Sequence, residues 1–364
     1  TFLGRDTSAI IGKRDLDILP TTISSSMQRI DRAVLRDTKA VSCEETIASP
    51  QGQRSFWITK FPLLNSTGEV FAIGSISTDI SQQKQAEDAM LRYHEQLAKT
   101  QAEVDVTQRI QALLLPEASE FQDIAGLELA SYIRPAEDVG GDYYDILRLG
   151  DHTKLAIGDV TGHGLESGLL MLMTQTAVRA LLVSGASDFK HILDSVNKTL
   201  FGNLQRMRVD KSLTLSLLDY HDGKVKLSGQ HEHVLIARAH NQDQSQDHNQ
   251  DQNQDHNQTQ VEILDTIDLG FPLGLEADIR PFLADTVFAL EPGDSVVLFT
   301  DGITEAENAA GARFGLKRLI ETLRSYHKQS AEAILDGIMS AVYQHTANHS
   351  TDDDLTLVVF KRVN

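Results

Sequence analysis

Four segments of this chain share one pattern: an apolar run that would form a buried strand has aspartate at its end, in most cases beside glycine. They lie at residues 139–145, 155–164, 295–305 and 351–360. A single Asp-Gly pair after a strand usually marks only a turn. Runs this apolar are expected in the middle of a sheet. We therefore expect the four acidic ends to lie close together in the folded chain.

An acidic cluster of this kind needs a cation. Two carboxylates 4 Å apart repel each other by ~4 kcal/mol at an effective dielectric constant of 20. Oxygen ligands without histidine or cysteine select hard ions such as Mg²⁺ or Mn²⁺ over Zn²⁺, and glycine lets backbone carbonyls approach such ions. The pattern predicts a site for two divalent cations, which together can activate water for attack on phosphorus.

Composition excludes several other classes of protein. The formal charge of −19 disfavours unaided nucleic-acid binding, and no run approaches the ~20 apolar residues of a membrane-spanning helix. The single cysteine, Cys43, fits a reducing cytoplasm and leaves the acidic region without a cysteine nucleophile. The sequence has no GxxxxGK[ST] phosphate-binding loop. Because it begins with Thr1 and shows no signal peptide, we expect a piece of a longer, cytoplasmic protein.

The first eighty residues predict a small sensor domain. Residues 55–63 and 70–77 are rich in β-branched and aromatic residues, with the turn sequence NSTG between them. This unit and the TDISQQKQAE that follows it resemble the C-terminal part of a PAS domain, and residues 3–20 resemble its helical middle. The first strands are missing, so we expect a partial PAS-like α/β domain over residues 1–80. It has no histidine for haem and no flavin-adduct motif around Cys43.

One long helix is predicted over residues 81–116. Good helix formers dominate, Pro and Gly are absent up to residue 115, and Pro116 ends the run. A heptad seam comprises Ala86, Met90, Tyr93, Leu97, Thr100, Val104, Thr107, Gln111 and Leu114, of which the threonines and the glutamine weaken it. We expect a parallel coiled-coil signalling helix, with a homodimer formed through residues 86–114, rather than a helix packed only on its own domain.

The rest of the chain, residues 117–364, is expected to form one α/β domain. It is interrupted at residues 241–260 by a tract of Asn, Gln, Asp, His and Ser, which offers almost no apolar side chain to offset its ordering entropy. We interpret this tract as a disordered insertion between two strands. His240, His248 and His256 recur every eight residues, but solvated filler is a better interpretation than metal binding.

The acidic motifs resemble the SpoIIE-type branch of the PPM serine/threonine phosphatases. They read GGDYYD at 140–145, GDVTGHG at 158–164, LFTDGITEA at 298–306 and DDDLTLVVF at 352–360, and PLGL at 272–275 is a further shared element. The resemblance spans residues 110–363. It implies an α+β fold, a PPM-type αββα sandwich, with two Mn²⁺ or Mg²⁺ ions bound between the ends of two packed sheets.

The resemblance also implies roles for individual residues. Asp142 would bind the second metal ion and Asp159 would bridge both ions, which makes these two the catalytic residues. The backbone carbonyl of Val160 would add an oxygen ligand. Asp301 and Asp353 would hold the first ion.

Four further positions have open roles. Asp354 corresponds to a position that orients ligands through hydrogen bonds. Asp145 either supports the ligands or is structural. His163 either caps the next helix or supports Asp159, because three residues separate it from the aspartate that histidine follows more closely in eukaryotic relatives. Arg134 is the nearest candidate for the arginine that binds substrate phosphate in those relatives.

These features favour a sensor-controlled phosphatase that acts on phosphoserine or phosphothreonine of a regulatory protein, by analogy an anti-sigma-factor antagonist. A diguanylate cyclase is a first alternative, since Gly140-Gly141-Asp142 begins like GGDEF. Tyr143 then stands where an acidic residue is required, and Asp301 is left unexplained. A catalytically inactive sensor-scaffold that binds a partner protein is a second alternative, which the complete set of acidic ligands disfavours.

Overall fold

The computed structural model describes residues 6–49, 52–116, 120, 121, 124, 126–136, 139–239, 260–347 and 353–363. The chain divides into two compact units, residues 1–100 and 101–364, each of which is described by itself. The predicted disordered tract, with His240, His248 and His256, falls outside the described residues except for Gln260.

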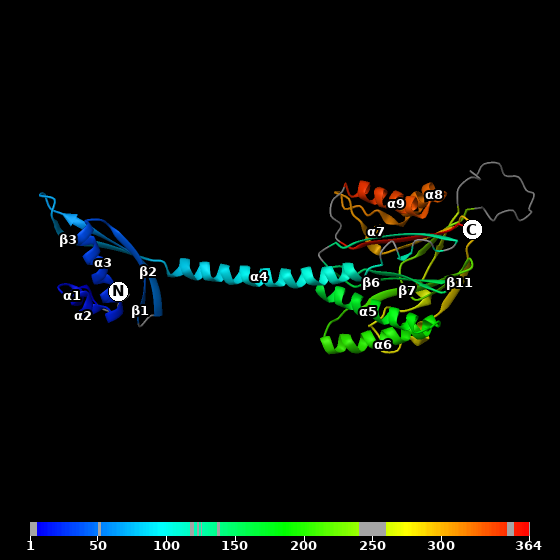
Figure 1. Cartoon of the computed structure of the whole chain (residues 1–364), viewed down its shortest axis with the longest axis horizontal. Coiled ribbons are helices and arrows are strands. Elements are labelled where there is room, and N and C mark those ends of the chain that lie inside the picture. The colour runs from blue at the N-terminus through cyan, green and yellow to red at the C-terminus, as the bar shows by residue number, and fades with distance from the viewer. Residues whose placement is uncertain are drawn as a thin grey trace, which may run out of the picture. The chain divides into compact units, whose positions relative to one another are not determined.

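The first unit is a small α/β domain (Figure 1, blue). Its elements are α1 (Thr7–Ile10), α2 (Asp15–Ile18), α3 (Thr21–Asp37), β1 (Val41–Ser49), β2 (Gly52–Leu64) and β3 (Val70–Asp79). The strands form an antiparallel sheet in the order β1-β2-β3. Met27, Ile30 and Val34, on one face of α3, pack with Ile58 of β2. The strands predicted at 55–63 and 70–77 are confirmed. β1 was missed because its sequence, VSCEETIAS, is short of apolar residues.

Helix α4 (Ser81–Leu114) begins where the sequence predicts. Asp79 Oδ1 accepts a 3.0 Å hydrogen bond from the Ser81 N–H and so caps the first turn. Met90, Tyr93 and Leu97 of the predicted seam are more than half exposed in the single chain. Such a stripe suits helix pairing, and the homodimer stays a prediction.

The second unit contains two five-stranded sheets, with strand orders β10-β9-β12-β13-β4 and β11-β8-β7-β6-β5. The strands are β4 (Leu127–Arg134), β5 (Tyr143–Leu149), β6 (His152–Val160), β7 (Leu213–His221), β8 (Lys224–Ser228), β9 (Val234–Ala237), β10 (Val261–Leu264), β11 (Asp285–Ala289), β12 (Ser295–Phe299) and β13 (Leu355–Arg362). The helices are α5 (Leu165–Val183), α6 (Phe189–Met207), α7 (Asp301–Glu305), α8 (Gly315–Tyr326) and α9 (Ala331–His345), besides two 3₁₀ turns, η2 (Ile267–Leu269) and η3 (Arg280–Phe282).

The two sheets stack face to face, and helices cover both outer faces. Figure 1 shows α8 and α9 over one sheet and α5 and α6 over the other. Strand β13 shows why: Val358 and Phe360 point into the core between the sheets, while Leu357 and Val359 point toward α8 and α9. A strand buried on both faces is a nearly continuous apolar run. The αββα sandwich expected from the sequence is confirmed.

Strands β9 and β10 flank the low-complexity tract and pair with each other, with Val261 opposite Ala237. The two ends of the tract are therefore held at neighbouring strand ends. Within the described residues, no helix is long and apolar enough to cross a membrane.

Candidate active site

Four aspartates predicted as metal ligands come from both sheets of the sandwich. Asp142 directly precedes β5 and Asp159 is the last but one residue of β6, so both belong to one sheet. Asp301 opens α7 directly after β12, and Asp353 lies just before β13, so both belong to the other. Each lies within electrostatic reach of at least one of the others. The two sheets thus bring together residues more than 200 positions apart.

The environment of this cluster opposes its ionisation. Burial raises the pKa of Asp159 to about 8, with further contributions from Asp301, Asp353 and Asp354. Burial and the charge of Asp159 raise the pKa of Asp142 well above its ordinary value. The pKa of Asp301 rises to about 6, first through burial and then through Asp353. Buried carboxylates this close need a positive charge to stay ionised, so an all-oxygen cation site fits these residues.

Two threonines of the opposite sheet hold Asp142. Its Oδ2 accepts hydrogen bonds from Thr300 Oγ1 at 2.8 Å and from Thr356 Oγ1 at 2.5 Å. Thr300 directly follows β12 and Thr356 lies in β13. These bonds fix one oxygen of Asp142 and leave the other to face the cluster. Both threonines lie within acidic motifs, LFTDGITEA and DDDLTLVVF, but neither was predicted as a site residue.

Asp354 binds backbone rather than facing the cluster. Its Oδ1 accepts from the Ala136 N–H at 2.8 Å, and its Oδ2 accepts from the N–H groups of Gly141 at 2.6 Å and Asp142 at 3.2 Å. A Cβ on Gly140 would lie 2.5 Å from Asp354 Oδ2, so the loop needs glycine there. Asp354 therefore positions the loop on which Asp142 stands.

The Val160 carbonyl faces the same loop. A Cβ built on Gly141 would lie 2.7 Å from the Val160 carbonyl oxygen, so glycine at this position allows close approach of the two segments. The Val160 N–H donates to the Gly141 carbonyl at 3.3 Å. This places the Val160 carbonyl beside both Asp142 and Asp159, where the sequence expects an additional oxygen ligand.

Asp145 lies outside the cluster. Its carboxylate accepts two hydrogen bonds from Arg179 of α5, at 3.1 and 3.2 Å, and one from the Ile146 N–H. Burial raises its pKa, and Arg179 opposes that rise. Of its two expected roles, the structural one matches this geometry: Asp145 ties α5 to the sheet.

His163 is exposed, at the edge of the cluster. Burial raises the pKa of Asp353, and the nearby His163 opposes that rise. The N-cap residue of α5 is Gly164, which has no side chain to cap the helix, and the role of His163 stays a prediction. Arg134 is engaged with α9, since its Nη1 donates to the Tyr343 hydroxyl at 3.2 Å.

Lys211 lies beside the loop that follows Asp159. Its Nζ donates to the Thr161 carbonyl at 2.8 Å and to Ser167 Oγ at 2.9 Å. A cation next to the ligand loop suits an incoming phosphate. The sequence offered no signal for Lys211, because it is 50 residues away from Thr161 and no motif surrounds it.

His231 joins the two sheets near the site. Its Nδ1 lies 2.8 Å from the Thr214 hydroxyl in β7, and its Nε2–H donates to the Phe299 carbonyl in β12 at 3.1 Å. Burial lowers the pKa of His231 to about 4. A neutral imidazole that accepts from the hydroxyl and donates to the carbonyl satisfies both partners.

The last turns of α4 contact the Asp142 loop. Gln111 is buried and its Nε2 donates to the Gly140 carbonyl at 2.7 Å, while Gln175 Nε2 donates to the Leu114 carbonyl at 3.3 Å. A cavity of about 230 Å³ separates this end of α4 from Asp142 and Asp354. Gln111 is thus occupied within its own chain, which corrects one position of the predicted dimer seam.

The carboxylate cluster is open. Among the described residues, the potential ligands whose atoms all lie within 4.8 Å of one another are Asp151, His152 and His221, which belong to a different part of the domain. The aspartates of the cluster are more widely spaced. Bound cations would offset the mutual repulsion of these carboxylates.

An αββα sandwich with an all-carboxylate site between the ends of its sheets defines a metal-dependent PPM-type serine/threonine phosphatase domain. The family model described as Stage II sporulation protein E (SpoIIE) matches residues 150–363, and a PAS fold model matches residues 1–85. The chain belongs to the SpoIIE family and has a PAS domain at its N-terminus. Both resemblances read from the sequence are confirmed.

Individual relatives agree with this assignment. Phosphoserine phosphatase RsbU of Bacillus subtilis is 25% identical over 269 residues, covering 72% of this chain and 70% of RsbU. The SiaA-PP2C domain of Pseudomonas aeruginosa superposes with a TM-score of 0.56 at 19% identity, covering 78% of this chain and 99% of that domain. The RsbU and RsbW domains of Rv1364c from Mycobacterium tuberculosis give a TM-score of 0.50 at 22% identity, covering 65% and 60% of the two chains.

Proposed function

We propose that this chain hydrolyses phosphoserine or phosphothreonine on a regulatory protein, using two Mn²⁺ or Mg²⁺ ions, under the control of its PAS domain. The proposal rests chiefly on one observation: four aspartates from both sheets lie within electrostatic reach of one another, and full or partial burial and mutual repulsion raise the pKa of each. A diguanylate cyclase would leave the aspartates of the second sheet, Asp301 and Asp353, without a role.

The chain's own residues would hold and orient the reacting groups. Asp142 and Asp159 would hold ions from one sheet, with the Val160 carbonyl beside them, and Asp301 and Asp353 from the other. When bound, two divalent cations supply Lewis-acid activation of water and neutralise charge on the phosphate. Thr300 and Thr356 would keep Asp142 in its orientation, and Asp354 would keep its loop in place.

Lys211 is the candidate for contact with the substrate phosphate. Its ammonium group lies at the loop after Asp159, and its hydrogen-bond partners among the described residues are a carbonyl and a hydroxyl rather than a carboxylate. Arg134, the sequence candidate, is directed to Tyr343 instead. Lys211→Gln should therefore raise KM for a phosphopeptide several-fold more than Arg134→Gln does.

The partner expected for this site is a phosphoserine protein of the anti-sigma-factor-antagonist class. The similarity to RsbU and to the RsbU and RsbW domains of Rv1364c supports this choice. A homodimer through the exposed part of α4 and a cytoplasmic location are further predictions. An Asp159→Asn variant, used as bait in a pull-down from lysate, would identify the substrate by retaining its phosphorylated form.

The first experiment is manganese-dependent hydrolysis of p-nitrophenyl phosphate, with and without EDTA. We expect turnover that EDTA abolishes and that Asp159→Asn abolishes without unfolding the chain. Phosphoserine and phosphothreonine peptides should be hydrolysed in preference to a phosphotyrosine peptide. A folded chain that turns over none of these substrates in Mn²⁺ or Mg²⁺ would favour the sensor-scaffold alternative.

A further inference from the structure

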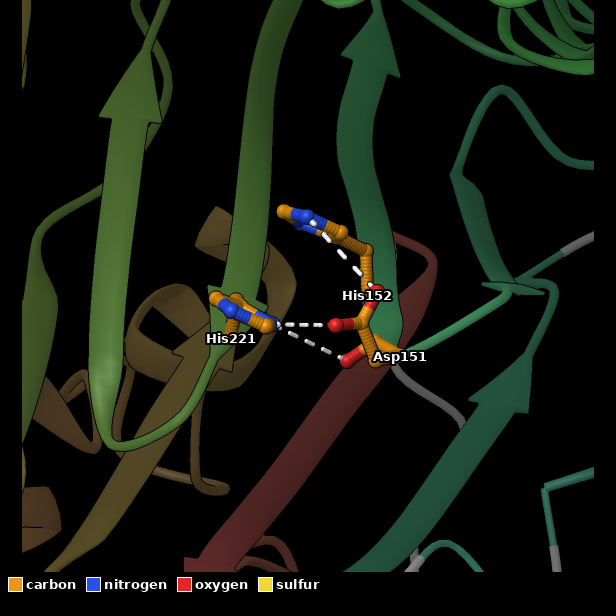
Figure 2. A group of neighbouring side chains, drawn as sticks. All are labelled: Asp151, His152 and His221. Carbon is orange, nitrogen blue, oxygen red and sulfur yellow. Dashed lines mark hydrogen bonds and ion pairs between the residues drawn. The ribbon is translucent and has the colours of Figure 1, made fainter.

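A second group of metal-ligand residues lies at the far end of the active-site strands. Figure 2 shows Asp151, His152 and His221 side by side at the end of β6 and β7. His152 begins β6, and Asp159 lies seven residues further along the same strand. At ~3.4 Å per residue, about 24 Å separates the two positions. This group is therefore distinct from the carboxylate cluster.

The strand register brings the two histidines together. Thr153 of β6 is paired with Tyr220 of β7, so His152 and His221 face each other one position beyond that pair. Their rings stack with centroids 4.3 Å apart and an interplanar angle of 15°. Asp151 adds a carboxylate, with Oδ2 3.5 Å from His221 Nδ1 and Oδ1 4.0 Å from His152 Nε2.

Hydrogen bonds select the same tautomer in both imidazoles. His152 Nδ1 lies 2.8 Å from Asp219 Oδ1, and His221 Nδ1 lies 3.3 Å from the Asp151 carbonyl. Neither oxygen can donate, so each Nδ1 holds the proton. The Nε2 of His152 then presents its lone pair on the side of Asp151 Oδ1, whereas the His221 ring has to turn, because Asp151 Oδ2 lies 3.5 Å from its Nδ1. A carboxylate on the far nitrogen is the usual partner of a metal-ligating histidine.

Asp219 is itself fixed in place. Its Oδ2 binds Lys154 Nζ at 2.5 Å, and Lys154 is buried. Asp219 therefore acts as a rigid acceptor for His152, with its charge already balanced by Lys154. Asp151, whose side chain is 77% exposed, is left as the carboxylate that can turn toward a cation.

We propose that Asp151, His152 and His221 bind one borderline divalent cation, such as Zn²⁺, separate from the catalytic ions. Two imidazoles and one carboxylate suit Zn²⁺, whereas the oxygen ligands of the active site suit Mg²⁺ or Mn²⁺. Water would complete the coordination. The bound ion would join the β5–β6 turn to the end of β7.

The side chains can reach one ion by rotation about their own bonds. Their ligand atoms lie within 4.8 Å of one another, and tetrahedral zinc with bonds of about 2.1 Å sets its ligands ~3.4 Å apart. His152 and His221 have 40% and 45% exposed side chains, so their rings can turn out of the stack and direct both Nε2 atoms to one point.

The test is calorimetric titration of the full chain with ZnCl₂, in buffer with Mg²⁺ in large excess over the protein. We expect one equivalent of zinc whose affinity falls at least ~30-fold in His152→Ala and in His221→Ala. Asp219→Asn leaves the three ligands intact but removes the carboxylate that orients His152, so it should weaken binding by about 10–100-fold. Manganese-dependent turnover should stay within about twofold of wild type in these variants, which shows that they fold.

The low-complexity tract and the residue before it supply the matched control, since they contain His240, His248 and His256. Changing those three histidines to Asn should leave the zinc equivalent unchanged. Electron paramagnetic resonance with Cu²⁺ in place of zinc should show two coordinated imidazoles in wild type and one in each single-histidine variant. Zinc binding that survives in His152→Ala and His221→Ala, or that is lost only in the tract variant, would overturn the proposal.

Discussion

The carboxylate of Asp354 accepts a 2.6 Å hydrogen bond from the backbone N–H of Gly141. Asp354 precedes β13 of one sheet, and Gly141 precedes β5 of the other. One sheet therefore fixes the loop on which the other presents Asp142. The stacking of the two sheets and the shape of the metal site are coupled through this contact.

Asp354→Ala should impair catalysis although Asp354 does not face the cluster. It removes the acceptor for three backbone N–H groups, and charge-assisted hydrogen bonds are worth about 1.5–3 kcal/mol each. A loop displaced by ~1 Å costs on the order of 100-fold in rate. We expect a loss of that size in manganese-dependent turnover, together with a higher half-saturating Mn²⁺ concentration. Asp278→Ala, at an exposed carboxylate in the same domain, should behave as wild type.

Asp159→Asn and Asp145→Asn should have opposite effects. Asp159→Asn removes a charge from a repelling cluster, so turnover should be lost while the free energy of unfolding in EDTA stays equal or rises. Asp145→Asn weakens the pair with Arg179, whose side chain is 33% exposed, and hydrogen bonds to charged groups are worth about 1.5–3 kcal/mol, so the free energy of unfolding should fall by about that amount. Urea unfolding and turnover, measured on both variants, check this. Near-wild-type turnover in Asp159→Asn would falsify the assignment of the site.

The acidic residues could be predicted from the sequence because each of them lies in a short motif of its own. Asp142 and Asp159 each stand beside glycine, Asp142 just before β5 and Asp159 near the end of β6, and both lie in the observed cluster. The αββα layering followed from the family resemblance of those motifs. The acidic residues and the layering were both predicted from short sequence segments, without knowledge of what those segments contact in the fold.

The residues that the sequence did not reveal act across the sandwich. Thr356 binds Asp142 over a separation of 214 positions, and His231 binds Phe299 over 68. Such contacts depend on sheet stacking and register, which local patterns do not encode. Gln111 shows the same limit: its heptad position indicates a seam, but packing against Gly140 decides its partner.

His231 predicts a pH dependence of stability. The pKa of its imidazole is about 4 in the folded chain and 6.5 when unperturbed. Because the folded chain favours the neutral imidazole, His231 contributes stability above pH 6.5. That stability is lost as the pH falls toward 4, because the unfolded chain binds the proton first. Relative to His231→Gln, wild type should lose about 1–2 kcal/mol of unfolding free energy between pH 7 and 4.5. This range follows from about 1.36 kcal/mol per pKa unit, reduced because His231 is only partly buried.

Urea unfolding in EDTA at a series of pH values measures that difference. The exposed His191 provides the control, since His191→Gln should keep a constant offset from wild type across the range. A difference between wild type and His231→Gln that does not change with pH would show that His231 keeps its ordinary pKa.

Replacement of residues 241–260 with a short Gly-Ser linker should leave turnover within about twofold of wild type. The flanking strands β9 and β10 pair directly, with Val261 opposite Ala237, so a short connection can close the hairpin. Steady-state hydrolysis of p-nitrophenyl phosphate checks this. A loss of more than tenfold without a change in melting temperature would assign the tract a role in catalysis.

The end of α4 provides the last prediction. Gln111 Nε2 donates to the Gly140 carbonyl at 2.7 Å, and Gly140 is two residues from Asp142. A helix that contacts the ligand loop can alter metal binding if the contact forms in one arrangement and breaks in another. Gln111→Leu removes the donor and replaces the amide with an apolar side chain of similar size.

We expect Gln111→Leu to leave the fold intact and to shift the half-saturating Mn²⁺ concentration several-fold, because the Gly140–Asp142 loop loses one of its anchors. Gln101→Leu provides the matched control: it places the same substitution on an exposed position of the same helix. Manganese titrations of turnover, with circular dichroism to verify folding, compare the two variants. Equal shifts in both would mean that the change reflects the helix in general, and no shift in either would mean that the Gln111 contact does not influence the site.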